Sequence, residues 1–293
     1  MLNQSTNRTQ PLSIAVAGAT GRVGRRLISQ LAQDPVTLLA LTRRKSSATF
    51  PHGVVAAELD FDQPSTLRKA LVGVDKLFIA HGTSPQQVAN EIALVDAAVE
   101  TGVQHIVKLS VMGPSTAINP FAWHSVIEAH LGRQPIASTV LRPTTFMDVL
   151  KRAGNAVATG TWAGAAGNGR VNLIDTRDVA DAARIAVLEE VAEGSKRAYH
   201  LTGARNWTMP QVAEELSGLL GYTVTYTNQS PAAQQAALIT AGLSPFVADL
   251  LLGLDRIFHD SILIERTLTV EDLIGRPPRS LSAWLLENLD AFK

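Results

Sequence analysis

Short runs of consecutive apolar residues alternate with amphipathic stretches over the first two thirds of the chain. The apolar runs are typical of strands buried on both faces, and the stretches between them repeat their apolar residues at helical spacing. The runs lie at 12–17, 36–41, 54–57, 77–80, 105–109 and 137–141. Because parallel strands need a crossover between them, this alternation predicts an α/β fold with a doubly wound parallel sheet.

The second half of the chain is less regular. We expect a first domain over residues 1–153, to whose sheet the segment 171–201 returns, and a smaller, mostly helical domain formed mainly by 154–293. The segment 154–169 is rich in glycine and alanine, which suits a lid that moves. Two capping boxes predict helix starts, Ser84 with Gln87 and Thr208 with Gln211.

The first apolar run leads directly into a turn that contains three glycines. Gly18 allows a sharp turn, Gly21 removes a Cβ where a pyrophosphate approaches the backbone, and Gly24 lets the following helix pack close to the sheet. The positive end of that helix then faces the phosphates. The pattern predicts a Rossmann-type dinucleotide site; a glycine turn without a ligand is the alternative.

Basic residues follow the second apolar run, at the position that selects the cofactor. An acidic side chain there would bind the ribose 2′-hydroxyl of NAD, whereas arginine neutralises the 2′-phosphate of NADP. Arg43 and Arg44 occupy this position, Arg22 lies in the glycine turn, and no Asp or Glu occurs between Val36 and Glu58. The cluster favours NADPH over NADH, with a solvated basic loop as the alternative.

Composition narrows the function classes further. Lys plus Arg and Asp plus Glu both number 26, so charge gives no argument for nucleic acid as a partner. The chain has no cysteine, which excludes a thiolate metal site and a cysteine nucleophile, and its histidines show no metal-binding spacing. No apolar run approaches the ~20 residues that span a membrane. Residues 1–11 lack the apolar core of a signal peptide, so we expect a cytoplasmic protein.

Three motifs together carry a family resemblance. They are residues 18–24, the stretch Leu141-Arg142-Pro143 with Phe146 and Met147, and the stretch 175–180 before an alanine-rich helix. The chain resembles the atypical short-chain dehydrogenase/reductase superfamily, in particular the NmrA-like group that includes NAD(P)H-dependent quinone oxidoreductases and triphenylmethane reductase. The closing stretch 273–278 with Trp284 is similar to the usual ending of that group.

The resemblance implies a set of cofactor-binding residues. The phosphate turn would comprise Gly18, Thr20, Gly21, Arg22, Val23 and Gly24. The 2′-phosphate site would contain Arg43 and its neighbour Arg44, and the ribose side of the cofactor would be followed by Ala80, His81 and Gly82. Asp60 and Phe61 match the adenine loop, although a capping aspartate and a core phenylalanine fit them equally well. Arg142 and Pro143 would line the nicotinamide pocket.

The helix after the fifth apolar run departs from the superfamily pattern. Ordinary members carry Tyr-x-x-x-Lys there, in which lysine lowers the pKa of the tyrosine for proton transfer. The tyrosines of this chain are Tyr199, Tyr222 and Tyr226, and no lysine lies between Lys108 and Lys151. Sugar epimerase, dehydratase and alcohol dehydrogenase chemistry are therefore disfavoured, as is the isoflavone-reductase-like branch.

The same helix offers histidine in place of the tyrosine–lysine pair. We expect His124 to donate a hydrogen bond or a proton to a reducible oxygen, with Ser110 as a second donor. Glu128 lies four residues after His124, on the same helix face. In the alternative, His124 only packs beside Trp123. Hydride transfer to a quinone forms an anion that water can protonate, so a dedicated acid is dispensable.

These observations predict an NADPH-dependent reductase acting on a quinone-like or otherwise conjugated small molecule. Phe146, Met147 and Trp162, with Trp207, are the apolar residues expected around that acceptor, unless they are simply core. The alternative is an NADP(H)-binding sensor that acts through a protein partner without turnover, since NmrA-like proteins of both kinds exist. A monomer or a homodimer suits either function.

Overall fold

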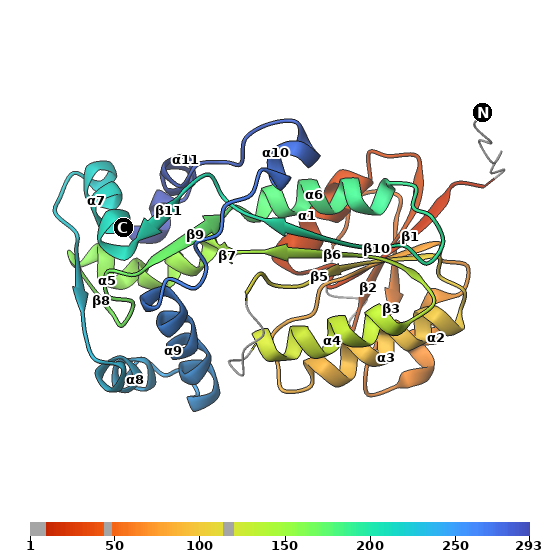
Figure 1. Cartoon of the computed structure of the whole chain (residues 1–293), viewed down its shortest axis with the longest axis horizontal. Helices are drawn as coiled ribbons and strands as arrows, with labels where there is room; N and C mark the ends of the chain where they lie inside the picture. Colours follow the sequence, from red (N-terminus) through yellow and green to blue (C-terminus); the bar gives the residue numbers. More distant parts are fainter. Residues whose placement is uncertain (1–9, 44–48, 114–119) are drawn as a thin grey trace. The chain divides into compact units, whose positions relative to one another are not determined.

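The large sheet of the chain has the strand order β10-β6-β5-β4-β1-β2-β3 (Figure 1). A computed structural model describes residues 10–43, 49–113 and 120–293 of the protein. β1 pairs in parallel with both β2 and β4, and β4 pairs in parallel with β5, so the strand order reverses at β1. The predicted fold class, a doubly wound Rossmann-type sheet, is confirmed.

The strands and helices of the sheet region are bounded as follows. The strands are β1 (Leu12–Ala17), β2 (Val36–Thr42), β3 (Val54–Glu58), β4 (Lys76–Ile79), β5 (His105–Leu109), β6 (Ala137–Pro143) and β10 (Lys196–Leu201). The helices are α1 (Arg22–Leu31), α2 (Pro64–Leu71), α3 (Gln87–Glu100), α4 (Phe121–Arg133) and α6 (Thr176–Leu188).

The remaining elements are shorter strands and helices. The strands are β7 (Thr145–Phe146), β8 (Thr161–Gly164), β9 (Arg170–Ile174), β11 (Asn206–Thr208) and β12 (Thr225–Asn228). The helices are α5 (Gly154–Ala158), α7 (Met209–Leu220), α8 (Pro231–Thr240), α9 (Pro245–His259), α10 (Thr269–Ile274), α11 (Leu281–Glu287) and the 3₁₀ helices η2 (Met147–Ala153) and η3 (Leu289–Phe292).

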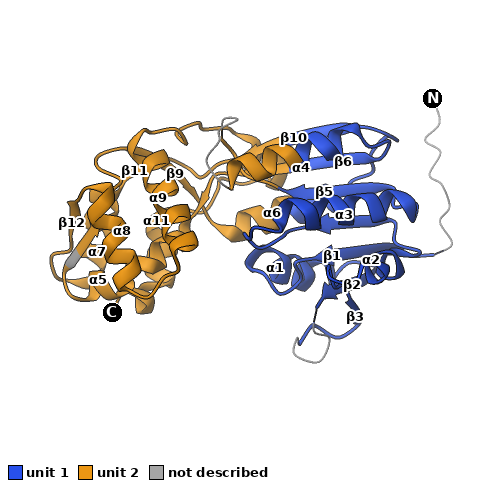
Figure 2. Cartoon of the chain, turned by 90° about the horizontal axis from the view of Figure 1, so that it is seen from below, with its two compact units in different colours: residues 1–109, 127–140, 183–198 blue, residues 110–126, 141–182, 199–293 orange. Residues whose placement is uncertain are grey.

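The chain forms two compact units, coloured separately in Figure 2. Unit 1 comprises residues 1–109, 127–140 and 183–198, and unit 2 comprises 110–126, 141–182 and 199–293. Of the segment 171–201 that was expected to return to the first sheet, β10 joins the large sheet, whereas β9 lies in a separate three-stranded sheet between β11 and β7.

The Gly/Ala-rich segment 154–169 is folded into α5 and β8. β8 pairs in parallel with β12 over four residues, and Gly169 lies so close to α9 that a Cβ there would approach Phe258 O to 2.0 Å. The glycines of this segment therefore serve close packing of the backbone at least at Gly169. The expected movement of the segment as a lid stays a prediction.

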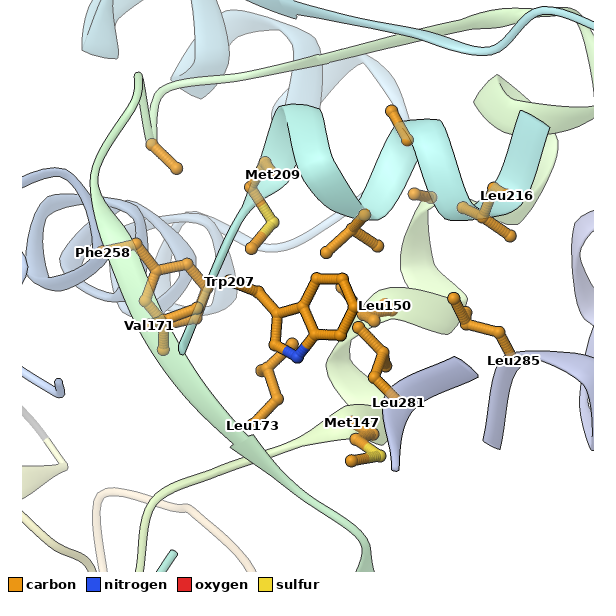
Figure 3. Packing of buried hydrophobic residues seen from close by; sticks show 14 of the residues in the cluster. Met147, Leu150, Val171, Leu173, Trp207, Met209, Leu216, Phe258, Leu281 and Leu285 are labelled. Carbon is orange, nitrogen blue, oxygen red and sulfur yellow. The ribbon is translucent and has the colours of Figure 1, made fainter. Parts of the chain in front are cut away.

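The core of unit 2 is built around the indole of Trp207 (Figure 3). Trp207 is 4% exposed, and aliphatic side chains from β9, α7 and α11 surround it. The Arg205 guanidinium lies 3.5 Å from the centre of the indole, a cation–π contact. The predicted capping box at the start of α7 is confirmed, since Gln211 N donates to Thr208 Oγ1 and Thr208 N donates to Gln211 Oε1.

The other predicted capping box, Ser84 with Gln87, does not form. α3 begins at Gln87 and has Gln86 as its N-cap residue. Gln87 is turned inward, and its side-chain amide donates to Glu91 Oε1 at 2.9 Å. Glu91 Oε2 lies 2.7 Å from Nζ of Lys108 on β5, and both side chains are fully buried. A buried ion pair, which the apolar spacing of α3 could not reveal, thus replaces the predicted cap.

His105 on β5 couples the stability of unit 1 to pH. Its Nε2 is bonded to Thr139 Oγ1 at 3.0 Å, and the residue is 1% exposed. Burial lowers the pKa of His105 from 6.5 to about 4, with help from the cations of Lys76 and Arg197. Below pH 6.5 the imidazole of His105 is protonated in the unfolded chain but stays neutral in the folded chain. Protonation therefore favours the unfolded chain, and the free energy of unfolding falls as the pH drops.

We expect this loss to lie between about pH 6.5 and 4 and to reach roughly 3 kcal/mol. Urea unfolding of the wild type and of His105→Gln across this range checks the expectation, because the variant lacks the titrating imidazole. The difference in unfolding free energy between the two proteins must shrink towards low pH. A difference that is independent of pH would contradict the assignment.

Candidate functional site

The turn between β1 and α1 is shaped by close backbone contacts. Gly18 has a φ of +80°, and a Cβ placed on it would lie 2.0 Å from Ala80 O on the neighbouring strand's end. A Cβ on Gly24 would lie 2.2 Å from Gly18 O. Gly21 N donates to Gly18 O at 2.9 Å and closes the turn. Gly18 and Gly24 are thus required by geometry, as the sequence pattern predicted.

Helix α1 begins as an anion site would. Gly21 is its N-cap residue in an extended conformation, and within the described part of the chain no side chain caps the helix. Thr20, Gly21 and Arg22 are exposed, whereas Val23 and Gly24 are buried against the sheet. The first-turn N–H groups and the helix dipole fit a phosphate, and the lack of a Cβ at Gly21 leaves its backbone approachable. These residues therefore fit the pyrophosphate of a dinucleotide.

Strand register brings the other predicted cofactor residues of unit 1 to the same edge. Ala17 is paired with Leu41 on β2 and with Ile79 on β4, so Gly18, Thr42 and Ala80 follow at one level. Arg43 comes next after β2 and is exposed. Arg44 lies outside the described residues. The predicted 2′-phosphate residue Arg43 and the phosphate turn thus belong to adjacent strand ends.

The expected adenine loop adjoins this edge, since Leu59 N donates to Thr42 O at 3.1 Å. The carboxylate of Asp60 is used within the loop: it accepts from Asp62 N and from Gln63 Nε2, each at 3.1 Å. The rings of Phe61 and His81 lie 5.3 Å apart at 57°. Phe61 therefore packs against His81, the second residue after β4. The Asp60 carboxylate serves as a turn residue.

His81 is engaged through both ring nitrogens. Its Nε2 lies 3.1 Å from Asn90 Nδ2, and its Nδ1 lies 2.5 Å from Gly82 O. Gly82 has open space around it, because a Cβ placed there would meet no atom within 4 Å. These bonds fix the backbone and the ring at the end of β4.

Unit 2 contains the predicted donors to the acceptor. Ser110, which directly follows β5, is 3% exposed, and its N–H donates to Leu141 O at 2.7 Å. Met112 N donates to Pro143 O at 2.8 Å, so this segment runs along the end of β6, the strand that carries Arg142 and Pro143. His124 lies in the first turns of α4 and is 8% exposed.

Helix α4, from Phe121 to Arg133, contains neither tyrosine nor lysine. Its Trp123 ring stacks against Phe246 of α9 with centres 6.2 Å apart and planes at 17°. His130 on the same helix bonds Asp96 at 2.6 Å. The catalytic roles of His124 and Ser110 stay predictions.

The predicted acceptor residues differ in burial. Met147 is 1% exposed and belongs to the core in Figure 3, as does Trp207. Phe146 on β7 is half-buried, and β7 is paired with β9. Trp162 packs against the same core, with its ring 5.2 Å from that of Tyr226 and perpendicular to it. Phe146 and Trp162 retain accessible surface for a ligand, whereas Met147 and Trp207 act mainly as core.

The described residues offer neither a metal site nor a membrane span. No group of three or more metal-binding side chains is placed there to hold a metal ion. No described helix has the length and hydropathy that crossing a membrane requires.

A glycine turn at the carboxyl edge of a doubly wound sheet, with an arginine beside it, defines a dinucleotide-binding protein. This chain belongs to the NmrA-like family, which matches residues 11–252. It is similar to quinone oxidoreductase 2 of Escherichia coli K12, with 32% identity over 92% of this chain and 96% of that enzyme. It is also similar to the NAD(P)H azoreductase of Xenophilus azovorans, with 29% identity over 95% and 99%.

A solved structure gives the same result. Triphenylmethane reductase of Citrobacter sp. complexed with NADP(H) superimposes with a TM-score of 0.85 and 26% identity, covering 94% of this chain and 99% of that one. These relatives are oxidoreductases. The predicted family and the predicted oxidoreductase class are therefore confirmed.

The close contact at Gly24 leads to a prediction about stability. We expect Gly24→Ala to lower the free energy of unfolding by about 1–3 kcal/mol, because the new Cβ must push the α1 backbone away from Gly18 O. Gly132 is the matched control, a helical glycine in α4 at which a Cβ would meet no atom within 4 Å. Gly132→Ala should leave stability unchanged or raise it by up to ~1 kcal/mol. Equal effects in urea unfolding would refute the packing role of Gly24.

Proposed function

We propose that the protein is an NADPH-dependent reductase that transfers a hydride to a quinone-like or otherwise conjugated small molecule. The observation that carries the proposal is the glycine turn of unit 1 with Arg43 at the adjacent strand end. The relatives support it, because their names describe a quinone, an azo compound and a triphenylmethane dye as acceptors and one of them was solved with NADP(H). All three acceptor classes are conjugated.

Binding in this proposal is divided among the residues already described. The N–H groups at the start of α1 hold the pyrophosphate, and Arg43 neutralises the 2′-phosphate, with Arg22 and Arg44 adding positive charge. Phe61 lies beside the adenine, and Arg142 and Pro143 line the nicotinamide side. When bound, NADPH would supply the hydride, which is one proton with two electrons.

The acceptor is reduced to an anion, and a proton completes the reaction. His124 and Ser110 hydrogen-bond the acceptor oxygen that gains the negative charge, and His124 or water delivers the proton. Phe146 and Trp162 form the apolar wall against which a flat acceptor packs, while Met147 belongs to the buried core against which Trp162 itself packs. The absence of tyrosine and lysine from α4 is compatible with this chemistry, since a quinone anion needs no strong general acid.

The rest of the proposal concerns setting. We place the protein in the cytoplasm as a monomer or a homodimer, with a nucleotide-binding domain over 1–153 and 171–201 and a smaller substrate-side domain over the remainder. The balance of 26 basic and 26 acidic residues gives no reason for nucleic acid as a partner.

The test is the oxidation of NADPH by the purified protein, followed at the absorbance of the reduced nicotinamide, with a panel of soluble quinones. We expect oxidation that depends on the quinone and is faster with NADPH than with NADH. Arg43→Ala should raise the KM for NADPH about 10- to 100-fold, because a charged hydrogen bond contributes about 1.5–3 kcal/mol, and should leave the KM for NADH nearly unchanged.

Arg133→Ala removes an exposed arginine from the last turn of α4 and is the matched control, which should preserve both KM values. Equal losses for the two nucleotides in Arg43→Ala would remove Arg43 from the 2′-phosphate site. NADPH that binds but is not oxidised with any quinone would replace the reductase by an NADP(H) sensor that acts through a protein partner.

His124 is tested separately from binding. We expect His124→Gln to lower kcat about tenfold, a modest value because water also protonates the product, while the Kd for NADPH stays the same. His130→Gln on the same helix is the control, since His130 is engaged by Asp96. An unchanged kcat in His124→Gln would assign His124 to packing alone.

A further inference from the structure

Unit 2 contains a second candidate binding site, whose residues differ from all those discussed above as cofactor or acceptor residues. A pocket of about 870 Å³ lies among the end of β12, the start of α8 and the last turns of α9. Its lining includes Asn228, Ser230, Pro231, Leu252, Asp255 and His259. A neighbouring pocket of about 480 Å³ shares Asn228 and His259 with it. The pocket is large enough for a small organic molecule.

The walls of this pocket are held by hydrogen bonds. Gly167 N donates to Asn228 Oδ1 at 3.0 Å, which ties the chain after β8 to the end of β12. Gln229 N donates to Gly164 O at 2.9 Å and extends the β8–β12 pairing into the pocket wall. Ser230 caps α8 through its side chain. The walls of the pocket are therefore formed by the paired strands β8 and β12 and by the capped start of α8.

Asp255 is the chemically distinctive residue of the lining. Its carboxylate accepts hydrogen bonds from Ala165 N and from the Gln234 side chain. Its Oδ2 atom is buried, and within the described part of the chain it has no hydrogen-bond partner. Burial raises the pKa of Asp255 from 3.8 to about 6. Keeping this carboxylate ionised in the folded protein therefore costs free energy.

The other charges of the pocket are already compensated. Asp260 is contacted by His259 Nδ1 at 2.9 Å and by Arg256 Nε at 3.7 Å, and these three side chains are largely exposed. In contrast, none of the ion pairs found in residues 10–43, 49–113 and 120–293 includes Asp255. A half-buried carboxylate without a cation among the described residues is the charge that a cationic ligand would compensate.

We propose that this pocket binds a small organic ammonium ion with an apolar body. The ammonium group pairs with the Asp255 carboxylate and donates hydrogen bonds to it. The apolar body packs against Leu252, Pro231 and Ala165, which line the same pocket. The proposal does not depend on the reductase function, because every residue that it uses lies in unit 2 and outside the predicted cofactor and acceptor residues.

The experiment compares benzylamine with benzyl alcohol as probes of the full chain. Backbone amide signals are followed by NMR at about pH 7.5, where Asp255 is ionised. We expect saturable shifts at β12 and α9 with benzylamine and a Kd at least about tenfold weaker with the uncharged alcohol. This comparison uses the wild type, so it does not depend on whether any variant folds.

Two variants then assign the binding to one carboxylate. Asp255→Asn should weaken benzylamine at least about tenfold, while Asp272→Asn, at an exposed position of α10 outside the pocket lining, should not change it. The proposal is overturned if the amine and the alcohol bind equally, if Asp255→Asn binds benzylamine as the wild type does, or if benzylamine gives no saturable shifts at β12 and α9 up to about 20 mM.

Discussion

The close approach of three backbone segments at Gly18, Gly24 and Ala80 is the constraint on which the nucleotide site depends. The carbonyl oxygens of Ala80 and Gly18 occupy the space that side chains would need. This contact fixes the distance between the ends of β1 and β4 and sets the first turn of α1 against the sheet. Because the N-cap residue of α1 is an exposed glycine, the first N–H groups of the helix have no side-chain cap among the described residues, at the turn that is predicted to bind a phosphate.

The same geometry explains why the residue after β2 is placed to select the cofactor. Parallel register carries Ala17, Leu41 and Ile79 to one level, so whatever follows β2 lies beside the phosphate turn. An arginine there offers a fork of donors to a 2′-phosphate, whereas a carboxylate would repel it. In the proposed site, cofactor choice therefore follows from strand pairing and one side chain. The residues predicted to meet the acceptor, by contrast, all lie in unit 2.

Local patterns explain which features could be predicted from the sequence. The glycine turn and the Thr208 capping box depend on residues a few positions apart, and both are present. Ser84 fails as a cap because Gln87 is recruited by Glu91, whose partner Lys108 lies on another element. Asp60 turns its carboxylate to its own loop. The predicted cap at Ser84 failed because of contacts between residues far apart in the sequence. The periodicity of a single sequence carries no information about such contacts.

Two kinds of buried or half-buried charge occur in the described part of this protein, those that are paired within the fold and one that lines a pocket. Asp178 is fully buried, but Arg276 Nη2 and Arg279 N each donate to it at 2.8 Å, which holds the stretch before α11 against α6. Lys108 and Glu91 likewise compensate each other. In such pairs the attraction between the two charges offsets the free energy that burying them costs, and the pairs stabilise the fold. Asp255 lines a pocket and has no such cation among the described residues, which is the arrangement expected where a ligand supplies the missing charge.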